Sequence, residues 1–121
     1  PLHHPVRVAE DWSLVDNLSN GRVGVAFASG WHPNDFVFAP HHHAVAKRVT
    51  FEGLDTVRRL WRGEPVTLKG PQDRDVVVRT LPRPVQPELP FWITTAGNPD
   101  TFRQAGAVGG EARPEPRGRR I

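Results

Sequence analysis

Apolar residues near the amino terminus recur with the spacing of an amphipathic helix. The predicted apolar stripe consists of Val8, Trp12 and Val15, with Leu14 and Leu18 beside it. Pro5 suits the first position of a helix, and residues 19–21 (Ser-Asn-Gly) are a typical helix stop. We therefore predict a helix that begins at Pro5, carries an apolar stripe along one side and stops at residues 19–21.

The next segment alternates between large and small side chains. Val23, Val25 and Phe27 are the larger residues, and glycine or alanine stands between them. Because successive strand residues point to opposite faces, we predict a buried strand from Arg22 to Ala28 with one packed face and one open face. A charge-free strand that opens into a loop such as Ser29-Gly30-Trp31 is typical of the carboxyl end of a parallel sheet, where ligands bind. An ordinary buried strand followed by a loop fits the same pattern.

A second helix and a hairpin are predicted beyond a long connection. The apolar face of the helix consists of Phe51, Leu54, Val57, Leu60 and Trp61. Gly63 ends this helix. Val66–Leu68 and Val76–Val78 flank a turn-rich stretch, which indicates a short hairpin.

The last regular elements follow a segment rich in proline. Residues 81–90 contain four prolines and are predicted to be extended. Phe91–Thr95 reads as a second buried strand, and Pro99 suits the start of a third helix. The inner face of that helix is predicted to hold Phe102, Ala105 and Val108.

Composition excludes several classes of function. The chain of 121 residues has no Cys, which removes disulfides, thiolate nucleophiles and Cys-ligated metals. No apolar run approaches the length of a membrane-spanning helix and no signal peptide is visible, so we expect a cytoplasmic protein with no membrane partner.

The basic charge does not point to nucleic acid. The net charge is +3 and the pI is about 10.5. Residues 109–121 hold four Arg and two Glu, so this tail carries +2 and the remaining body only +1. Charges of both signs alternate along the predicted helices, which is typical of a solvated surface and not of a phosphate-binding one. We therefore expect no nucleic-acid partner.

The tail itself does not fit the α/β pattern. From Gly109 to Ile121 the only apolar side chains are Ala112 and Ile121. Such a sequence buries too little surface to order a backbone. We expect residues 1–108 to form the folded part and residues 109–121 to be a tail, either produced by a frameshift or aberrant end of the reading frame, or disordered.

Three long segments resemble the luciferase-like flavin monooxygenases. They are residues 1–36 (PLHHPVRVAEDWSLVDNLSNGRVGVAFASGWHPNDF), residues 51–64 (FEGLDTVRRLWRGE) and residues 82–106 (PRPVQPELPFWITTAGNPDTFRQAG). The resemblance is closest to the subgroup that accompanies nonribosomal peptide and polyketide assembly lines, and it extends to about Val108. It implies a (β/α)8 TIM barrel, which needs about 250 residues. We therefore expect a partial barrel, a fragment of about three β/α units with a hairpin insertion. Its open sheet edges predict marginal stability or association. The two predicted strands should lie side by side in parallel, and the loops after them should share one rim, with residues 29–31 near Gly97 and Asn98.

The best candidate for cofactor binding lies where the third helix begins. Free backbone N–H groups and a Thr hydroxyl at a helix start after a strand suit a phosphate. The resemblance implies that Gly97, Asn98 and Thr101, with Ala96 beside them, contact FMN. Asp100 would repel a phosphate unless it points outward. Simple helix capping by Asn98 is the alternative.

The second candidate is the loop after the first strand. By resemblance this loop meets the flavin ring and phosphate: Ser29 donates a hydrogen bond, Gly30 allows close backbone approach, and Trp31 forms a wall of the pocket. The family sometimes has Arg at the position of Ser29, and Trp31 could equally pack in the core.

The histidines support no metal site or general base. His41-His42-His43 are neighbours that cannot easily converge on one metal ion, so we expect a solvated loop. His3 and His4 follow a predicted strand exit, where they either face the flavin or cap the following helix. His32 is equally undetermined, and the catalytic residues stay unassigned.

The resemblance implies an FMN-dependent monooxygenase in natural-product biosynthesis. Reduced FMN and molecular oxygen would act on a small-molecule or carrier-bound substrate, and a separate flavin reductase would supply the reduced cofactor. The chain alone is expected to be inactive. Alternatives are a flavin or deazaflavin oxidoreductase without oxygenation, a non-catalytic fragment, or a basic binding module.

Overall fold

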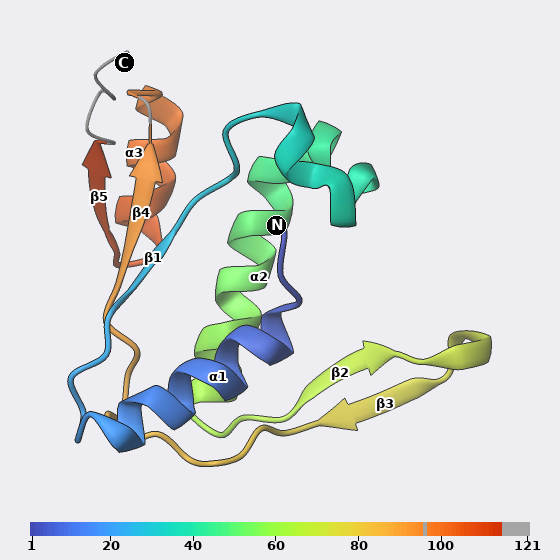
Figure 1. Cartoon of the computed structure of the whole chain (residues 1–121), viewed down its shortest axis with the longest axis vertical. Coiled ribbons are helices and arrows are strands. Elements are labelled where there is room, and N and C mark those ends of the chain that lie inside the picture. Colours follow the sequence, from blue (N-terminus) through green and yellow to red (C-terminus); the bar gives the residue numbers. More distant parts are fainter. Residues whose placement is uncertain (96, 115–121) are drawn as a thin grey trace.

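Helices and parallel strands alternate along most of the chain (Figure 1). The structure is a computed structural model and describes residues 1–95 and 97–114, with side chains for residues 1–95 and 97–110. The helices and strands are α1 (Pro5–Leu18), β1 (Val25–Phe27), α2 (Ala46–Trp61), β2 (Val66–Lys69), β3 (Asp75–Val78), β4 (Phe91–Thr95), α3 (Pro99–Ala107) and β5 (Glu111–Pro114). Short 3-10 helical stretches are η1 (Pro33–Phe38), η2 (Pro40–Val45) and η3 (Pro71–Asp73).

The central sheet has the strand order β1-β4-β5, and both pairings are parallel. Val25 lies opposite Phe91 and Phe27 opposite Ile93. This confirms that the two predicted strands lie side by side in parallel, although β1 is shorter than the predicted Arg22 to Ala28. Two parallel strands joined through a helix are the unit from which a (β/α)8 barrel is built.

The two faces of β1 differ as their sequence predicts. Val23 and Val25 are buried, whereas Gly24, Ala26 and Ala28 are exposed. On the open face, the ring of Trp92 from β4 covers Gly24, and a Cβ at Gly24 would lie 2.6 Å from that ring. The small residue at position 24 therefore makes room for the large one on the neighbouring strand.

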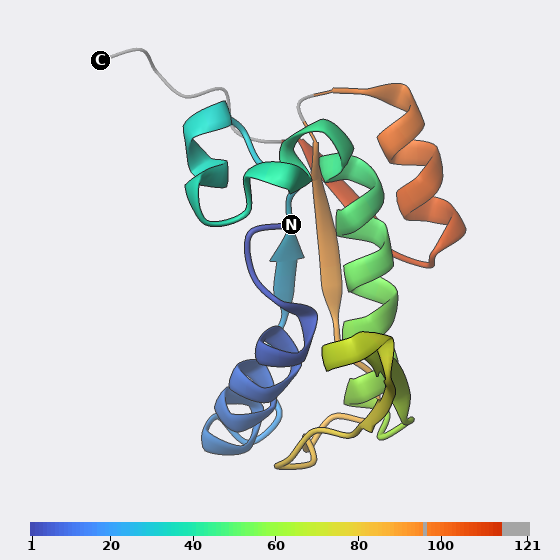
Figure 2. The same cartoon turned by 90° about the vertical axis from the view of Figure 1, so that its right-hand side faces the viewer.

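Helices α2 and α3 lie on the same side of β4 (Figure 2). One buried residue from each element forms their contact: Leu54, Ile93 and Ala105. Phe102 of α3 was predicted to face inward, but 39% of its surface is exposed. A second apolar cluster joins α1, α2 and β1 and includes Ala9, Val25, Val57, Leu60 and Trp61.

Helix α1 buries small and polar residues more deeply than its apolar stripe. Its buried residues are Ala9, Ser13 and Asp16, while 39% of Trp12 and 78% of Leu18 are exposed. Of the stripe, Val8 packs against the core. Small and polar residues can face inward here because Ser13 Oγ donates to the carbonyl of Ala9 and Asp16 receives hydrogen bonds from distant segments.

Asp16 is a buried carboxylate that holds the proline-rich segment in place. It accepts hydrogen bonds from the N–H groups of Val23, Val85 and Gln86 and from Gln86 Nε2, the last at 2.7 Å. Burial raises the pKa of Asp16, but the hydrogen bonds from Gln86, Val23 and Val85 outweigh it, so the pKa lies below its ordinary value. The extended segment before β4 is thereby fixed to the end of α1.

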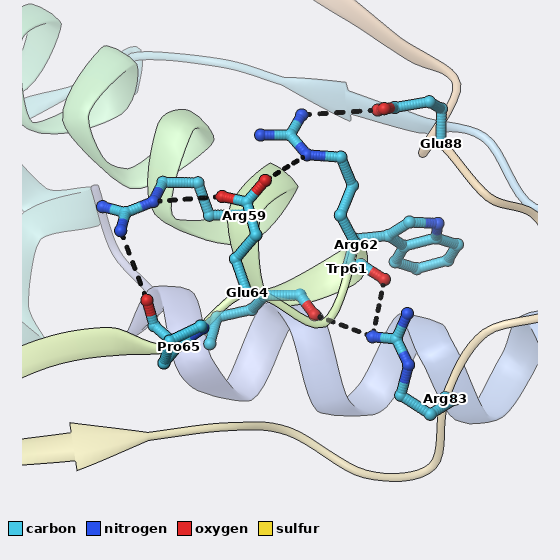
Figure 3. A network of polar contacts seen from close by, with 8 residues as sticks. Arg59, Trp61, Arg62, Glu64, Pro65, Arg83 and Glu88 are labelled. Carbon is cyan, nitrogen blue, oxygen red and sulfur yellow. Dashed lines mark hydrogen bonds and ion pairs between the residues drawn. The ribbon is translucent and has the colours of Figure 1, made fainter.

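The end of α2 is fixed to the same segment (Figure 3). Arg83 Nη1 donates to the carbonyls of Leu60 and Trp61, at 3.3 and 3.0 Å. Trp61 Nε1 donates to the carbonyl of Gln86 at 2.9 Å. Two carbonyls of the last helical turn thus receive a cationic donor.

Ion pairs surround this junction. Arg62 lies 2.9 Å from Glu64 and 3.5 Å from Glu88 (Figure 3). The hydrogen bond from Arg62 lowers the pKa of Glu64 below its ordinary value. Because these side chains are partly exposed, the pairs orient the chain more than they stabilise it.

The hairpin and the tail complete the fold. Strands β2 and β3 pair antiparallel, which confirms the predicted hairpin, and they project from the rest of the molecule (Figure 1). Strand β5 pairs parallel to β4, although no ordered backbone was expected beyond Gly109. Backbone pairing needs no apolar side chain, so this polar sequence can extend the sheet by one strand. Residues 115–121 of the predicted tail lie outside the described residues.

Candidate functional site

The carboxyl ends of β1 and β4 lie at the same edge of the sheet because the two strands are parallel. Thr94 Oγ1 donates to the carbonyl of Phe27 at 3.3 Å, which ties the two strands together at that edge. Both predicted cofactor loops leave the sheet here, one after Phe27 and the other after Thr95. The prediction that the carboxyl ends of both strands lie at one edge is confirmed. The proximity of residues 29–31 to Gly97 and Asn98 stays a prediction.

The start of α3 is organised around Asn98. Its side-chain Oδ1 accepts from the N–H of Asp100 at 2.9 Å, so Asn98 caps the helix. Its backbone carbonyl accepts from the N–H groups of Thr101 and Phe102, at 3.1 and 3.3 Å. These three N–H groups, which were expected to be free, are therefore engaged with Asn98. Thr95 Oγ1 in turn accepts from the N–H of Asn98 at 3.3 Å.

Two polar groups at this helix start remain available to a ligand. Within the described part of the chain, neither Asn98 Nδ2 nor Thr101 Oγ1 has a hydrogen-bond partner. Gly97 has a φ of +100°, and no described atom lies within 4 Å of a Cβ built on it. Ala96, the fourth predicted residue here, lies outside the described residues.

The charge of Asp100 is paired. Arg103 Nη1 lies 3.2 Å from Asp100 Oδ1, and both side chains are mostly exposed. Asp100 therefore points outward. Its charge then does not oppose a phosphate bound at this helix start.

The loop after β1 is exposed. Ser29 and Gly30 are exposed, and 76% of the surface of Trp31 is exposed, which excludes core packing for this tryptophan in the described fold. Gly30 has a φ of +93° and lies directly against the ring of Phe36. The loop therefore presents a hydroxyl, a bare backbone and an indole at the edge of the sheet.

The histidines serve structural roles at three positions. His4 Nδ1 accepts from the N–H of Val6 and caps α1, which favours the capping alternative. His32 caps η1 in the same way. His42 is hydrogen-bonded to the carbonyl of Pro1 at 2.7 Å, so the triplet is not the simple solvated loop that was expected. Within the described residues no group of three or more His, Cys, Asp or Glu could hold a metal ion.

A cavity of about 950 Å³ lies beside β1, between α1 and α2. The successive residues Val25, Ala26, Phe27 and Ala28 all line it. Because such residues point to alternate faces, this cavity follows the free edge of β1 and not its open face. Of the predicted site residues that the structure describes, Gly30 alone lines it. The cavity therefore reaches the loop after β1 at Gly30, and the described residues at the start of α3 do not line it.

Sequence reasoning missed Phe36 and Thr95. Phe36 supports Gly30, and Thr95 supports Asn98. The segment His32-Pro33-Asn34-Asp35 carries a readable signal for Phe36, since a capping residue, a proline and an acidic third position mark a helix start that turns the chain back. Thr95 offers no such signal because its role depends on the turn that follows it.

Comparison with known proteins assigns this α/β arrangement to a family. The model of the luciferase-like monooxygenase family matches residues 1–111. The chain belongs to this family. A relative from Streptomyces nodosus subsp. asukaensis, 4-hydroxyprotoasukamycin monooxygenase, is 34% identical over 112 residues, which cover 90% of this chain and 30% of that protein.

Two further relatives differ in the cofactor that their names give. The F420-dependent glucose-6-phosphate dehydrogenase of Amycolatopsis mediterranei is 30% identical over 111 residues, covering 88% of this chain and 32% of that protein. The FMNH2-dependent dimethylsulfone monooxygenase of Pseudomonas fluorescens is 28% identical over 89 residues, covering 70% of this chain and 24% of that protein.

Solved structures show the same fold. Monooxygenase RslO1 from Streptomyces bottropensis superposes with a TM-score of 0.72 at 28% identity, covering 92% of this chain and 34% of that one. The oxygenating constituent of 3,6-diketocamphane monooxygenase from Pseudomonas putida, a type II Baeyer-Villiger monooxygenase in complex with FMN, superposes with a TM-score of 0.68 at 19% identity, covering 94% and 35%. The partial luciferase-like barrel expected from the sequence is thereby confirmed.

The luciferase-like match concerns a limited part of each relative. The chain spans about a quarter to a third of the length of these relatives and structures. In the part that the structure describes, none of the helices has the length and apolar character needed to cross a membrane.

Proposed function

We propose that this chain forms part of the flavin site of a luciferase-like monooxygenase that uses reduced FMN and molecular oxygen to oxygenate a small-molecule or carrier-bound substrate. The observation that carries the proposal is the parallel pairing of β1 and β4, because it directs two loops with suitable donors to one edge of the sheet. Family membership and the FMNH2-dependent relative support the choice of flavin.

The residues at the start of α3 suit a phosphate group. Asn98 Nδ2 and Thr101 Oγ1 are donors without partners in the described part of the chain, and the positive end of the α3 dipole adds to them. The open backbone at Gly97 would allow a ligand to approach closely. We assign Ala96 to the same site by its place in the sequence.

The loop after β1 would hold the ring end of the cofactor. Ser29 offers a hydroxyl donor, and Trp31 offers a flat apolar surface that is now exposed to solvent. The small residues Ala26 and Ala28 are exposed on the open face of β1 and would leave room for a flat ring beside the sheet. When bound, reduced FMN supplies the electrons that activate oxygen, and these residues would orient it.

A matched pair of ligands and one substitution test this assignment. Asn98→Asp keeps the helix cap, since Asn and Asp cap equally well, but it removes the Nδ2 donor and adds a negative charge. We expect the Kd of FMN to rise at least about tenfold, as for the loss of a charge-assisted hydrogen bond. The Kd of riboflavin, which lacks the phosphate, should not change. An equal effect on both flavins, no effect on FMN, or failure of the unsubstituted chain to bind FMN would contradict the proposal.

A deazaflavin oxidoreductase is the second candidate, because one relative is F420-dependent. Titrating the chain with FMN and with F420 under the same conditions separates the two. Tighter binding of F420 would favour the oxidoreductase, whereas selective binding of FMN would favour the monooxygenase.

The wider biological role rests on the same comparisons. We propose a role in natural-product biosynthesis, a separate reductase as the source of reduced flavin, and a cytoplasmic location. The relative named for protoasukamycin supports a role in natural-product biosynthesis. The neighbour titled as an oxygenating constituent supports a separate reductase, because its title describes one component of a larger system.

A further inference from the structure

The loop after β1 folds back on itself so that Phe36 lies beneath Gly30. Only 4% of the surface of Phe36 is exposed, although its neighbours Val37 and Phe38 are 71% and 91% exposed. A Cβ at Gly30 would lie 2.6 Å from Cζ of Phe36, so the ring fills the space that a side chain at position 30 would need. Gly30 also has a φ of +93°, which favours glycine.

Local hydrogen bonds bring Phe36 back to this position. His32 Nδ1 accepts from the N–H of Asn34 at 3.1 Å, and Asp35 Oδ2 accepts from the N–H of His32 at 2.9 Å. This reciprocal capping, with Pro33 at the first helical position, starts η1 immediately after Trp31. The chain therefore reverses within a few residues of Gly30.

A second contact to the ring of Phe36 comes from η2. The rings of Phe36 and His43 meet edge to face with their centroids 5.2 Å apart. His43 belongs to η2, and the N–H of Ala39, between the two 3-10 stretches, donates to the carbonyl of Phe36 at 2.9 Å. Phe36 is thus fixed between Gly30 and η2.

We propose that Phe36 is a positioning residue for the loop Ser29-Gly30-Trp31. It acts through Gly30 and holds the loop in the conformation that presents Ser29 and Trp31 at the edge of the sheet. The assumption that this loop binds the flavin ring rests on the proposed function. The packing of Phe36 against Gly30 stands independently of any ligand.

Three variants of the 121-residue chain test the role of Phe36. Phe36→Ala removes the ring, Phe36→Leu keeps an apolar side chain of intermediate size, and Val37→Ala is the matched control at an exposed neighbour. The first readout is the set of backbone amide NMR signals of Ser29, Gly30 and Trp31, which is practical for a chain of 13.5 kDa. The second is the Kd of FMN by titration.

In Phe36→Ala we expect the three loop signals to shift or broaden while those of Leu60 and Ile93 stay in place. The Kd of FMN should rise about tenfold, because a misplaced contact group loses its interaction with the ligand. Phe36→Leu, which keeps only part of the packing against Gly30, should shift the same loop signals and raise the Kd of FMN by a smaller but measurable amount, and Val37→Ala should change neither. Unchanged loop signals in Phe36→Ala, or an equal response of Val37→Ala, would overturn the positioning role.

Two results separate this inference from the proposed function. If the unsubstituted chain binds no FMN, the flavin assignment fails, while the loop signals alone still decide whether Phe36 positions the loop. If Phe36→Ala also loses the signals of Leu60 and Ile93, the whole fold has been disturbed and this variant says nothing about the loop alone. The comparison of Phe36→Leu with Val37→Ala then decides whether Phe36 positions the loop. A Phe36→Leu chain with an unperturbed loop and unchanged Kd would then overturn the inference.

Discussion

At the scale of single residues, Asp16 joins three parts of the chain. Its carboxylate is fully buried and accepts four hydrogen bonds, from Val23, Val85 and both the backbone and side chain of Gln86. A buried charge is costly unless such donors surround it, and here they replace the lost water. Asp16 therefore contributes to stability only as long as it is ionised.

We predict that Asp16→Asn destabilises the fold at neutral pH by about 3 kcal/mol, since an amide cannot accept all the donors that face the carboxylate. The free energy of unfolding by urea measures the loss. Hydrogen exchange of the amides of Val85 and Gln86 should rise in parallel, because these donors lose their acceptor. Asp11→Asn, at an exposed carboxylate on the same helix, is the control and should have little effect.

The stability lost in Asp16→Asn should depend on pH, because the pKa of Asp16 is lowered in the folded state. A carboxylate whose pKa is depressed in the folded state contributes stability that is present above its unfolded value of about 3.9 and is lost as pH falls through the folded value. The difference in free energy of unfolding between the unsubstituted chain and Asp16→Asn should therefore be largest at neutral pH and disappear below about pH 4. A difference that stays constant in acid would contradict the role of the ionised form.

Asp16 also explains why the packed face of α1 could not be predicted. Helical spacing selects the apolar residues Trp12 and Val15, yet the partners that make Asp16 an inward residue lie about 70 positions later in the sequence. Such a partner leaves no trace in local periodicity. By contrast, the alternation around Val25 was sufficient to predict both faces of β1, because the sheet itself separates them.

At the scale of elements, α2 offers two glycines with opposite roles. Gly53 lies inside the helix, and nothing lies within 4 Å of a Cβ built there. Gly63 follows the helix with a φ of +82°, and a Cβ there would lie 2.6 Å from the guanidinium of Arg83. The first glycine weakens the helix, whereas the second is required for its end.

We predict that Gly53→Ala stabilises the chain by about 0.5–1 kcal/mol and that Gly63→Ala destabilises it by about 2 kcal/mol. The first value reflects helix propensity alone. The second combines a strained backbone with displacement of Arg83 from the carbonyls of Leu60 and Trp61. Thermal unfolding followed by circular dichroism compares the two directly, and a shift of the same sign for both variants would contradict the argument.

The order of helices and strands up to α3 could be predicted from the sequence, whereas β5 could not. Phe91–Thr95 has the apolar and β-branched residues of a buried strand, and β4 has those same bounds. Glu111–Pro114 lacks them and still pairs with β4, because parallel backbone bonding is available to any sequence without interior proline. The candidate loops were found from their place after strands, but the support that Phe36 gives to Gly30 depends on a close contact that spacing does not reveal.

At the scale of the whole molecule, the sheet is open within the described part of the chain. Strands β1 and β5 each pair on one side only, and both are edges. Trp31, Val37 and Phe38 are largely exposed beside the candidate site. Open edges and exposed apolar residues favour association, so marginal stability or self-association stays a prediction for this chain.

The exposed site leads to the last prediction, that the 121-residue chain alone does not oxygenate a substrate. Flavin-dependent oxygenation needs a closed pocket that excludes water, and a complete barrel takes about 250 residues. Here Ser29 and Gly97 are exposed, and Trp31 faces solvent. The chain should bind FMN weakly through its two loops and show no turnover. The assay supplies reduced FMN, oxygen and a panel of acyl or aminoacyl carrier substrates, and it detects oxygenated product by mass, with a complete luciferase-like relative as the positive control. Product that disappears in both Ser29→Ala and Asn98→Asp would show that this part of the barrel is itself a working enzyme and would overturn the prediction.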